Sequence, residues 1–513
     1  MEFGEGTAKI KFKEDDPNDT REKIKIRIGV FFDGTLNNST NINQRLIASD
    51  ENALTPEERF AAEELKRGKD QKELKQAQKT YKKYGSPGED NSYEGYYTNV
   101  YKLHQYTNIK LGMTPGYDLV DKVYVDGPGT DNMKSDKTAG FAFAMGPSGV
   151  PAKVADGVIK VFEKIKKLAP DKSKNIIELI TIDVYGFSRG AAGARKFIND
   201  VLFGRRFVFA GGSVGSPDPD TTIRSQLTKM GYTIMAPGAK TGVQVCVAGL
   251  FDTVSTYGLG VVIDEDDNVD ALSLNAVFHA EETLHLTAAE EHRYHFSLTN
   301  TQSAGSRGKQ YFLPGVHSDI GGGYRDDGDE EQPILGSIKF KDEFLLQSCN
   351  IDEEQAKADR ENLIAAGWYH EEEIHIENHD YHIQTPGMMK SGVPPQLVQR
   401  RIEKVDRKDI QNHYSTIPLQ IMAKSAHEKG IKFKSRLKRD ESVPAELSSV
   451  QGKIQAYISK QGNYTSQNSD WLENREELMR KLRHDYLHFS ARMAPGHDPR
   501  IENGKRVRKI YRG

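Results

Sequence analysis

Cysteine is almost absent from this sequence of 513 residues, which contains only Cys246 and Cys349. Two thiols exclude a disulfide-stapled scaffold and a zinc site built from cysteine ligands. No run of 18 apolar residues occurs, and the first residues lack the basic and apolar regions of a cleaved export signal. We therefore expect a protein that is cytoplasmic in the producing cell and is not exported by a signal peptide.

Concentrated positive charge is also lacking. The formal net charge is −3, and the one basic stretch considered as a nucleic-acid contact is a short tail, Lys505 to Arg512. A basic stripe with interleaved aromatic residues is absent, so nucleic acid is not a predicted partner. The length of the chain, with 36% hydrophobic and 28% charged residues, allows a large core and a second module.

The most informative stretch is a predicted buried strand that runs directly into a helix. Residues Ile176 to Tyr185 are rich in β-branched and aromatic side chains, and the segment from Ala191 is alanine-rich and helix-prone. Gly-Phe-Ser-Arg-Gly stands between them at 186–190. Strand, sharp turn and helix form the context of a nucleophile elbow, which exposes its serine above a helix N-terminus. Ser188 is the candidate nucleophile, and a serine in an ordinary tight turn is the alternative.

A second Gly-x-Ser-x-Gly match shows why this context matters. Ser213 also follows an apolar run, but Pro217 and Pro219 come soon after it. Two prolines forbid a helix at that point, so we assign Ser213 to a loop.

The other predicted strands also end in polar residues. Four further apolar runs are expected to form strands: Ile24 to Phe32, Leu119 to Val125, Val243 to Phe251 and Lys309 to Leu313. Helices are expected between strands, among them one at 152–167 and one at 272–289. This alternation predicts an α/β fold, an α/β-hydrolase-like, mostly parallel sheet with helices on both faces, in which ligands bind beyond the carboxyl ends of the strands. Five polar residues lie at such ends and should converge: Asp33, Asp126, Ser188, Asp252 and His317.

Three of these residues follow the Ser, Asp, His order of the α/β-hydrolase triad. His317 would take the proton of the Ser188 hydroxyl and return it to the leaving group. Asp252 would bind the other ring nitrogen and so fix the tautomer and orientation of the imidazole. The backbone N–H groups of Arg189 and Gly34 would hold the oxyanion. Neither a metal nor another cofactor is expected.

Simpler interpretations exist for several residues. Asp252 could cap a turn, and Asp319 suits an Asx-type turn better than a bond to His317 or to a cation. The residues F-D-G-T-L at 32–36 suggest a phosphatase loop of the haloacid-dehalogenase type, but Phe31 stands where that chemistry needs a nucleophilic aspartate. Four histidines in or near the predicted 272–289 helix are expected to be structural: His279, His285, His292 and His295.

Two regions fall outside the alternation of strands and helices. A charged segment opens at Thr55-Pro56-Glu57-Glu58, the pattern of a capping box, and runs to Tyr84. We expect it to form a solvated helical insert, at about 40–95, within a catalytic domain of residues 1–330. Residues 331–513 are charged, with helical stretches such as 352–366 and 473–488. They predict a mainly helical module that serves as a lid, docks a partner or contacts a membrane.

Five blocks of the sequence resemble the α/β-hydrolase domain family that includes the first class of type VI secretion lipase effectors. They are G-V-F-F-D-G-T-L-N-N at 29–38, Y-V-D-G-P-G-T at 124–130, Y-G-F-S-R-G-A-A at 185–192, G-L-F-D-T-V-S at 249–255 and L-P-G-V-H-S-D-I-G-G-G-Y at 313–324. The resemblance implies esterase activity of phospholipase A type on glycerophospholipids, with the triad on Ser188, Asp252 and His317. It also implies that the last segment, 487–490, packs on the hydrolase core.

The same resemblance implies partners and a destination. A secretion-system spike protein would deliver the antibacterial effector into the periplasm of a target cell, and a cognate immunity protein would neutralise it. Two other functions stay open, because a catalytic triad does not determine which acyl group the enzyme cleaves. One is a serine hydrolase of a non-lipid ester, thioester or peptide, and the other is a binding module without turnover.

Overall fold

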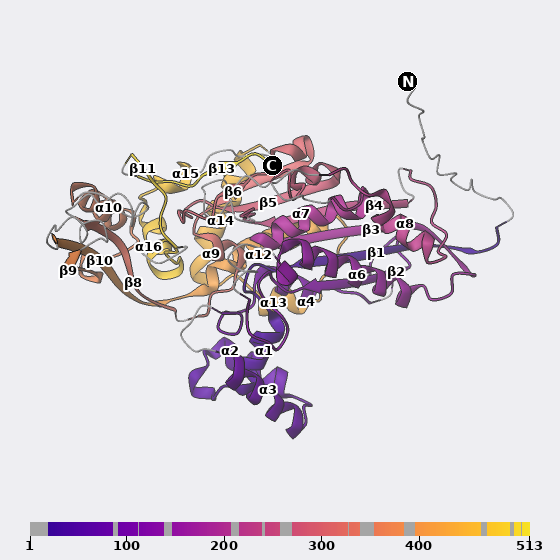
Figure 1. The fold of residues 1–513 in the computed structure, drawn as a ribbon, viewed down its shortest axis with the longest axis horizontal. Coiled ribbons are helices and arrows are strands. Elements are labelled where there is room, and N and C mark those ends of the chain that lie inside the picture. Colours follow the sequence, from indigo (N-terminus) through magenta and orange to yellow (C-terminus); the bar gives the residue numbers. More distant parts are fainter. Residues whose placement is uncertain are drawn as a thin grey trace, which may run out of the picture.

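The computed structural model describes residues 19–85, 91–110, 112–137, 146–206, 215–238, 242–256, 269–326, 328–338, 353–383, 396–462, 469–492, 497–503 and 505–513 (Figure 1). A six-stranded sheet forms the centre of the fold. Its strands lie in the order β2 (Leu119–Val125), β1 (Glu22–Phe32), β3 (Asn175–Phe187), β4 (Gly242–Phe251), β5 (Ala280–Ala288) and β7 (Gly308–Leu313). Every neighbouring pair is parallel. The predicted α/β fold with a mostly parallel sheet is confirmed.

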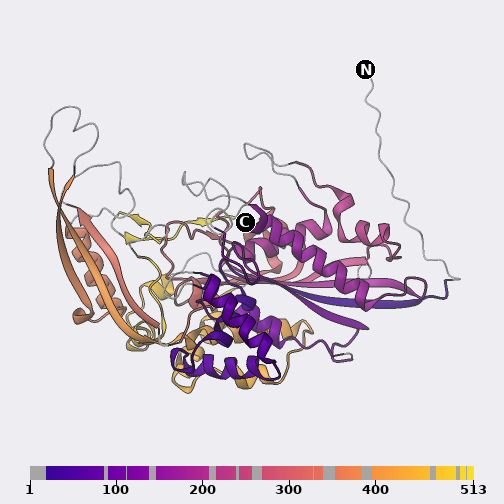
Figure 2. The ribbon, with the colours of Figure 1, turned by 60° about the horizontal axis from the view of Figure 1, so that its bottom comes forward.

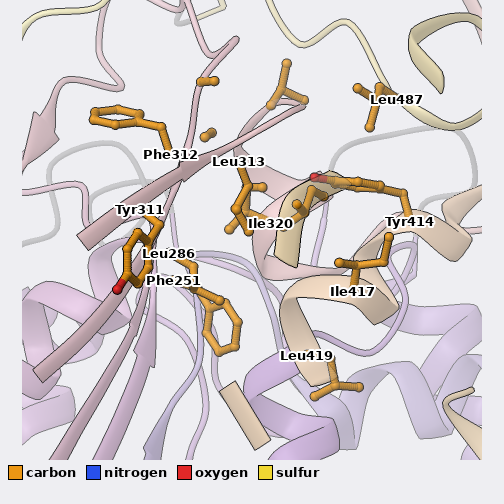
Figure 3. Packing of buried hydrophobic residues seen from close by; sticks show 14 of the residues in the cluster. Phe251, Leu286, Tyr311, Phe312, Leu313, Ile320, Tyr414, Ile417, Leu419 and Leu487 are labelled. Atoms are coloured by element: carbon orange, nitrogen blue, oxygen red, sulfur yellow. The ribbon is translucent and has the colours of Figure 1, made fainter. Parts of the chain in front are cut away.

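Helices cover both faces of the sheet because its central strands are apolar on both sides. On one face, Phe32 of β1 packs in a cluster with residues of α6 (Val150–Leu168) and α7 (Arg189–Leu202). On the other face, Phe31 packs with residues of α4 (Asn99–Tyr106) and α12 (Thr416–Glu428). Successive residues of a strand point to opposite faces, so these two phenylalanines belong to different cores. Figure 3 shows part of the second core, where Phe251 and Leu286 of the sheet face Ile417 and Leu419 of α12.

The segment 272–289 corrects the sequence prediction, which had placed a helix there. It forms a 3-10 helix, Leu274–His279, followed by strand β5 between β4 and β7. From Thr283 to Ala288 every residue of β5 is buried. Alanine, glutamate and leucine favour a helix, but pairing on both edges of the strand overrides that local preference.

The charged insert forms three helices: α1 (Ser39–Ala48), α2 (Pro56–Lys66) and α3 (Gln71–Tyr84). They project from one side of the sheet domain (Figures 1 and 2). The predicted capping box is present, because Glu58 N donates to Thr55 Oγ1 and Thr55 N donates to Glu58 Oε2. Buried Glu58 also forms ion pairs with Arg45, at 2.6 Å, and Arg325, at 2.9 Å. These ion pairs fasten α1 and α2 to the chain that follows the central sheet.

A second, antiparallel sheet lies at the opposite end of the molecule from the start of β1 (Figures 1 and 2). Its order is β8 (Gly328–Ile338), β10 (Gln396–Ile410) and β9 (Ile374–Ile383), with α10 (Glu353–Ala366) packed against it. The sequence had predicted a mainly helical region and gave no sign of this sheet. Arg407 of β10 anchors it, since its buried guanidinium pairs with Glu330 of β8 at 2.8 Å and donates to Leu487 O.

The last part of the chain returns to the central sheet. The other α-helices of the described residues are α8 (Ile223–Lys229), α9 (His317–Gly321), α13 (Arg436–Asp440), α14 (Ser448–Lys460), α15 (Ser469–Leu472) and α16 (Glu477–Tyr486). Leu487 and Phe489 are buried in the same cluster as Phe251 and Leu286, and Figure 3 shows Leu487 in this cluster. Within the ranges given above, no helix combines the length and apolar character needed to span a bilayer.

Candidate active site

Ser188 lies at the turn between β3 and α7 in a strained backbone conformation. Its φ is 57° and its ψ is −130°, values that a residue with a side chain rarely adopts. Such a conformation costs roughly 1–3 kcal/mol and persists only where the surroundings enforce it. Here Ser188 N donates to Phe251 O at 3.1 Å, and Val254 N donates to Ser188 O at 3.4 Å. The end of β4 therefore holds the serine in the geometry of a nucleophile elbow.

The two glycines of the motif are required by close backbone packing. A Cβ atom on Gly190 would lie 2.1 Å from the carbonyl oxygen of Asp33, and one on Gly186 would lie 2.5 Å from Gly190 O. Both distances are far below van der Waals contact. The elbow thus packs directly on the loop after β1. The competing motif at Ser213 lies outside the described residues.

Asp252 and His317 form a buried pair at the ends of β4 and β7. His317, the first residue of α9 (His317–Gly321), donates from Nδ1 to Asp252 Oδ2 at 2.5 Å. Its backbone N–H donates to Glu291 Oε2, and its ring contacts Phe187 and Phe296 at centroid distances of 4.6 and 5.0 Å. The Nδ1 bond leaves Nε2 as the ring atom available for proton transfer.

Ser188 is connected to His317 through its neighbour Phe187 and, among the described residues, has no direct bond to the histidine. Phe187, which contacts the His317 ring, directly precedes Ser188. In the part of the chain that the structure describes, no hydrogen bond joins Ser188 Oγ to His317. Such contacts are often long in enzymes without substrate and shorten in the substrate complex.

Burial and neighbouring charges set the protonation of the pair. Burial lowers the pKa of His317 below its ordinary value, and the hydrogen bond to Asp252 offsets only part of this effect. Burial raises the pKa of Asp252, but Arg508 and His317 outweigh it and hold that pKa well below its usual range. The resting site therefore contains an ionised carboxylate beside a neutral imidazole near neutral pH.

One family of known proteins matches part of this chain. Residues 217–341 match the family model "T6SS, Phospholipase effector Tle1-like, catalytic domain". This segment contains Asp252 and His317, and it confirms the resemblance to type VI secretion lipase effectors that the sequence predicted. No curated protein sequence matches the chain.

One solved structure has a similar fold. The structure titled "Structure of the Tle1 effector bound to the VgrG spike from the Type 6 secretion system" has a TM-score of 0.58 and 20% sequence identity, covering 98% of this chain and 98% of that chain. An uncharacterized protein from Pseudomonas aeruginosa has a TM-score of 0.37 and 16% identity, covering 88% of this chain and 52% of that chain.

Arg508 is a member of the site that the sequence analysis missed. Its guanidinium binds the Asp252 carboxylate through two hydrogen bonds, Nη1 to Oδ1 and Nη2 to Oδ2, each 2.8 Å long. The residue belongs to the basic tail at 505–512, beyond the segment that matches the Tle1-like catalytic domain. No local pattern marks it, because its partner lies 256 residues earlier in the chain.

The two predicted oxyanion donors lie on adjoining segments. Arg189 begins α7, and its side-chain Nε donates to Thr35 Oγ1 at 2.6 Å, which connects the elbow to the loop after β1. Gly34 N donates to Asp33 Oδ1 at 2.8 Å, while Tyr124 and Thr98 hydroxyls donate to the same carboxylate. Burial raises the pKa of Asp33 to about 7. The Gly34 amide is thus committed to a neighbouring carboxyl group in the resting state.

Other polar residues near the strand ends have structural partners. Asp126 forms a buried ion pair with Lys153, so the bonds of Asp126, like those of Asp33, are not with Ser188, Asp252 or His317. Asp319 accepts from Val316 N, as an Asx-type turn predicts, but its other oxygen accepts from Nδ1 of His488 rather than from His317. His285 lies on β5, not on a helix, and accepts from Thr253 N. Among the described residues, no group of three or more His, Cys, Asp or Glu side chains is arranged to hold a metal ion.

Proposed function

We propose that this protein is a serine esterase that hydrolyses acyl esters of glycerophospholipids, of phospholipase A type. The observation that carries the proposal is the placement of Ser188 on a strained elbow beside the buried His317–Asp252 pair. The match of residues 217–341 to a phospholipase effector domain supports the choice of substrate class.

The proposed chemistry uses this chain's own side chains throughout. Ser188 Oγ attacks the ester carbonyl while His317 Nε2 takes its proton. Asp252 stabilises the imidazolium that forms. His317 then protonates the departing lysolipid alkoxide, and a water molecule, deprotonated by the same nitrogen, releases the fatty acid from the serine.

The oxyanion would be held by two backbone N–H groups. The Arg189 amide is at the N-terminus of α7, where the helix dipole favours negative charge. The Gly34 amide would have to exchange its bond to Asp33 for one to the oxyanion. Each such donor contributes about 3–4 kcal/mol to the transition state.

The proposal extends to the role of the enzyme. The Tle1 effector of similar fold was solved bound to the VgrG spike. We propose that a spike protein also carries this chain, that its target is phospholipid reached from the periplasm of another cell, and that an immunity protein protects the producer. Among the described residues no helix could span a bilayer.

Substrate choice tests the proposal directly. A phospholipid with two distinguishable acyl chains, dispersed in detergent, is expected to be hydrolysed, and the released fatty acid identifies the acyl position. Soluble p-nitrophenyl esters are expected to react more slowly, because their acyl chains bury less apolar surface. Excess EDTA is included as a check for metal dependence. Turnover of soluble esters or peptides with no lipid hydrolysis would favour the non-lipid alternative.

The pH dependence of kcat/KM should reflect His317. A general base works only when neutral, so activity falls as the pH drops through its pKa. Burial lowers that pKa below the ordinary 6.5. We therefore expect kcat/KM to stay level from neutral pH down past 6.5 and to fall only in more acidic buffer. The measurement is kcat/KM on a soluble ester between about pH 4.5 and 8.5. An acid limb centred above 6.5 would contradict the prediction.

A further inference from the structure

The end of the chain is held in a fixed register beside the active site. Strand β13 (Ile510–Tyr511) pairs in parallel with β6 (Leu298–Thr299), and Leu298 N donates to Lys509 O at 2.9 Å. The segment that leads into β6 carries Phe296, whose ring contacts His317. The backbone bond of Lys509, the next residue, therefore places Arg508 beside the proposed triad.

Arg508 uses this position to bind three different parts of the site. Besides its two bonds to Asp252, it donates from Nε to Phe296 O at 2.8 Å and from Nη1 to Ala288 O at 3.2 Å. Its side chain is 2% exposed and that of Asp252 is fully buried. A guanidinium is a planar fork that matches both oxygens of a carboxylate, so it fixes the plane of the carboxylate as well as its charge.

As a result, each oxygen of the Asp252 carboxylate accepts two hydrogen bonds. Oδ1 accepts from Ala288 N and Arg508 Nη1, and Oδ2 accepts from His317 Nδ1 and Arg508 Nη2. Removing Arg508 would leave one bond on each oxygen. A carboxylate with two bonds can tilt, and a tilt at Oδ2 turns the imidazole away from the serine.

We propose that Arg508 is a positioning residue of the triad, and that the strand at the end of this chain is a working part of the active site. The inference rests on the proposed function, since it assigns Arg508 a role in the chemistry of Ser188 and His317. It adds a fourth residue, from a segment outside the region that matches the Tle1-like catalytic domain.

Arg508 also balances charge around the histidine. The groups that face His317 are Asp252, Glu291 and Arg293, with Arg508 behind Asp252. Glu291 and Arg293 pair with each other at 2.9 Å. Without Arg508 the negative charge of Asp252 is no longer compensated, so it favours the imidazolium form and raises the pKa of His317. The histidine then becomes neutral, and active as a base, only at higher pH.

The chain offers a matched control for this role. Arg506, two residues earlier, forms a similarly buried ion pair with Asp359 of α10 at 2.9 Å, and its side chain is 5% exposed. Arg506→Ala therefore removes a buried arginine from the same tail without touching Asp252.

The test compares Arg508→Ala, Arg508→Lys and Arg506→Ala, with kcat/KM on a soluble ester followed across pH. Arg508→Ala is expected to lower kcat/KM by about 10²-fold, the typical effect of misplacing a reacting group. Its acid limb is expected to move to higher pH. Arg508→Lys keeps the charge and should retain the wild-type acid limb while losing rate. Added guanidinium ion at millimolar level should restore part of the activity of Arg508→Ala.

Two outcomes would overturn the inference. One is an Arg508→Ala variant with the rate and pH profile of Arg506→Ala. The other, should Arg508→Ala not fold, is an Arg508→Lys variant with wild-type kcat, which would show that bidentate positioning is not needed. Both results are measured on ester turnover, so they require that the wild-type protein first be shown to hydrolyse the ester. That function fails separately, if Ser188→Ala retains turnover.

Discussion

Ser188→Ala is expected to abolish ester hydrolysis, with a fall in kcat of about 10⁶-fold. The hydroxyl is the only atom of the residue that reacts, and without it the neighbouring imidazole has no proton to accept. Residual hydrolysis would come from direct attack of water on the ester, with the oxyanion donors stabilising the intermediate. The measurement is turnover of dispersed phospholipid and of a soluble ester by both proteins. Labelling by a fluorophosphonate, located by mass spectrometry, should occur at residue 188 of the wild type alone.

Stability measurements provide the control for this variant. Alanine replaces a hydroxyl by a hydrogen and leaves the backbone bonds to Phe251 and Val254 in place. We expect the thermal unfolding of Ser188→Ala to resemble that of the wild type. If activity on either substrate is unchanged in a folded variant, Ser188 has no part in the mechanism.

Asp252→Asn is expected to lower kcat by about 10⁴-fold, because an amide stabilises the wrong imidazole tautomer and cannot balance the imidazolium. It also leaves the buried Arg508 without its counter-charge. Removing one partner of a buried ion pair costs about 3–5 kcal/mol, so the free energy of unfolding should fall by a similar amount. Both quantities are measured on the same preparation, by steady-state kinetics and by denaturant unfolding.

Asp183→Asn separates the two effects. Asp183 of β3 binds Arg27 through two hydrogen bonds, of 2.6 and 2.9 Å, and both side chains are buried. Its loss should reduce stability much as Asp252→Asn does, yet it should leave kcat nearly unchanged, because the pair lies in the middle of the sheet. Equal losses of kcat in the two variants would show that Asp252 acts only through stability.

Local patterns in the sequence predicted most of the central sheet. The strands that end at Phe32, Val125, Phe251 and Leu313 were recognised because each is a short apolar run closed by glycine, proline or aspartate. Strand β5 was missed, since its alanine, glutamate and leucine residues favour a helix and only its partners on both sides make it extended. The antiparallel sheet was missed for a related reason. Strand β10 is so rich in charge that it resembles a solvated segment.

The residues of the candidate site show the same division: some lie in local sequence motifs, and others are brought to the site only by the fold. Ser188, Asp252 and His317 stand at strand ends in motifs that can be read locally, and the structure places Asp252 and His317 in contact. Two other neighbours of His317 lie in no recognisable motif. Glu291 accepts a hydrogen bond from the His317 backbone, and Phe296 contacts the His317 ring. Arg508 could not be found from sequence at all, because a long-range ion pair leaves no periodicity and no spacing rule.

The distance along the chain between Asp252 and Arg508 has a consequence for synthesis. A ribosome adds Arg508 only 256 residues after Asp252, which takes roughly 10–50 s at ordinary translation rates. Throughout that interval the carboxylate lacks the cation that makes its burial tolerable. The nascent sheet therefore cannot form the ion pair between Asp252 and Arg508 before residue 508 has been synthesised. Under the proposed function, a nascent polypeptide without residue 508 would therefore contain Ser188, Asp252 and His317 but lack the side chain that orients the Asp252 carboxylate.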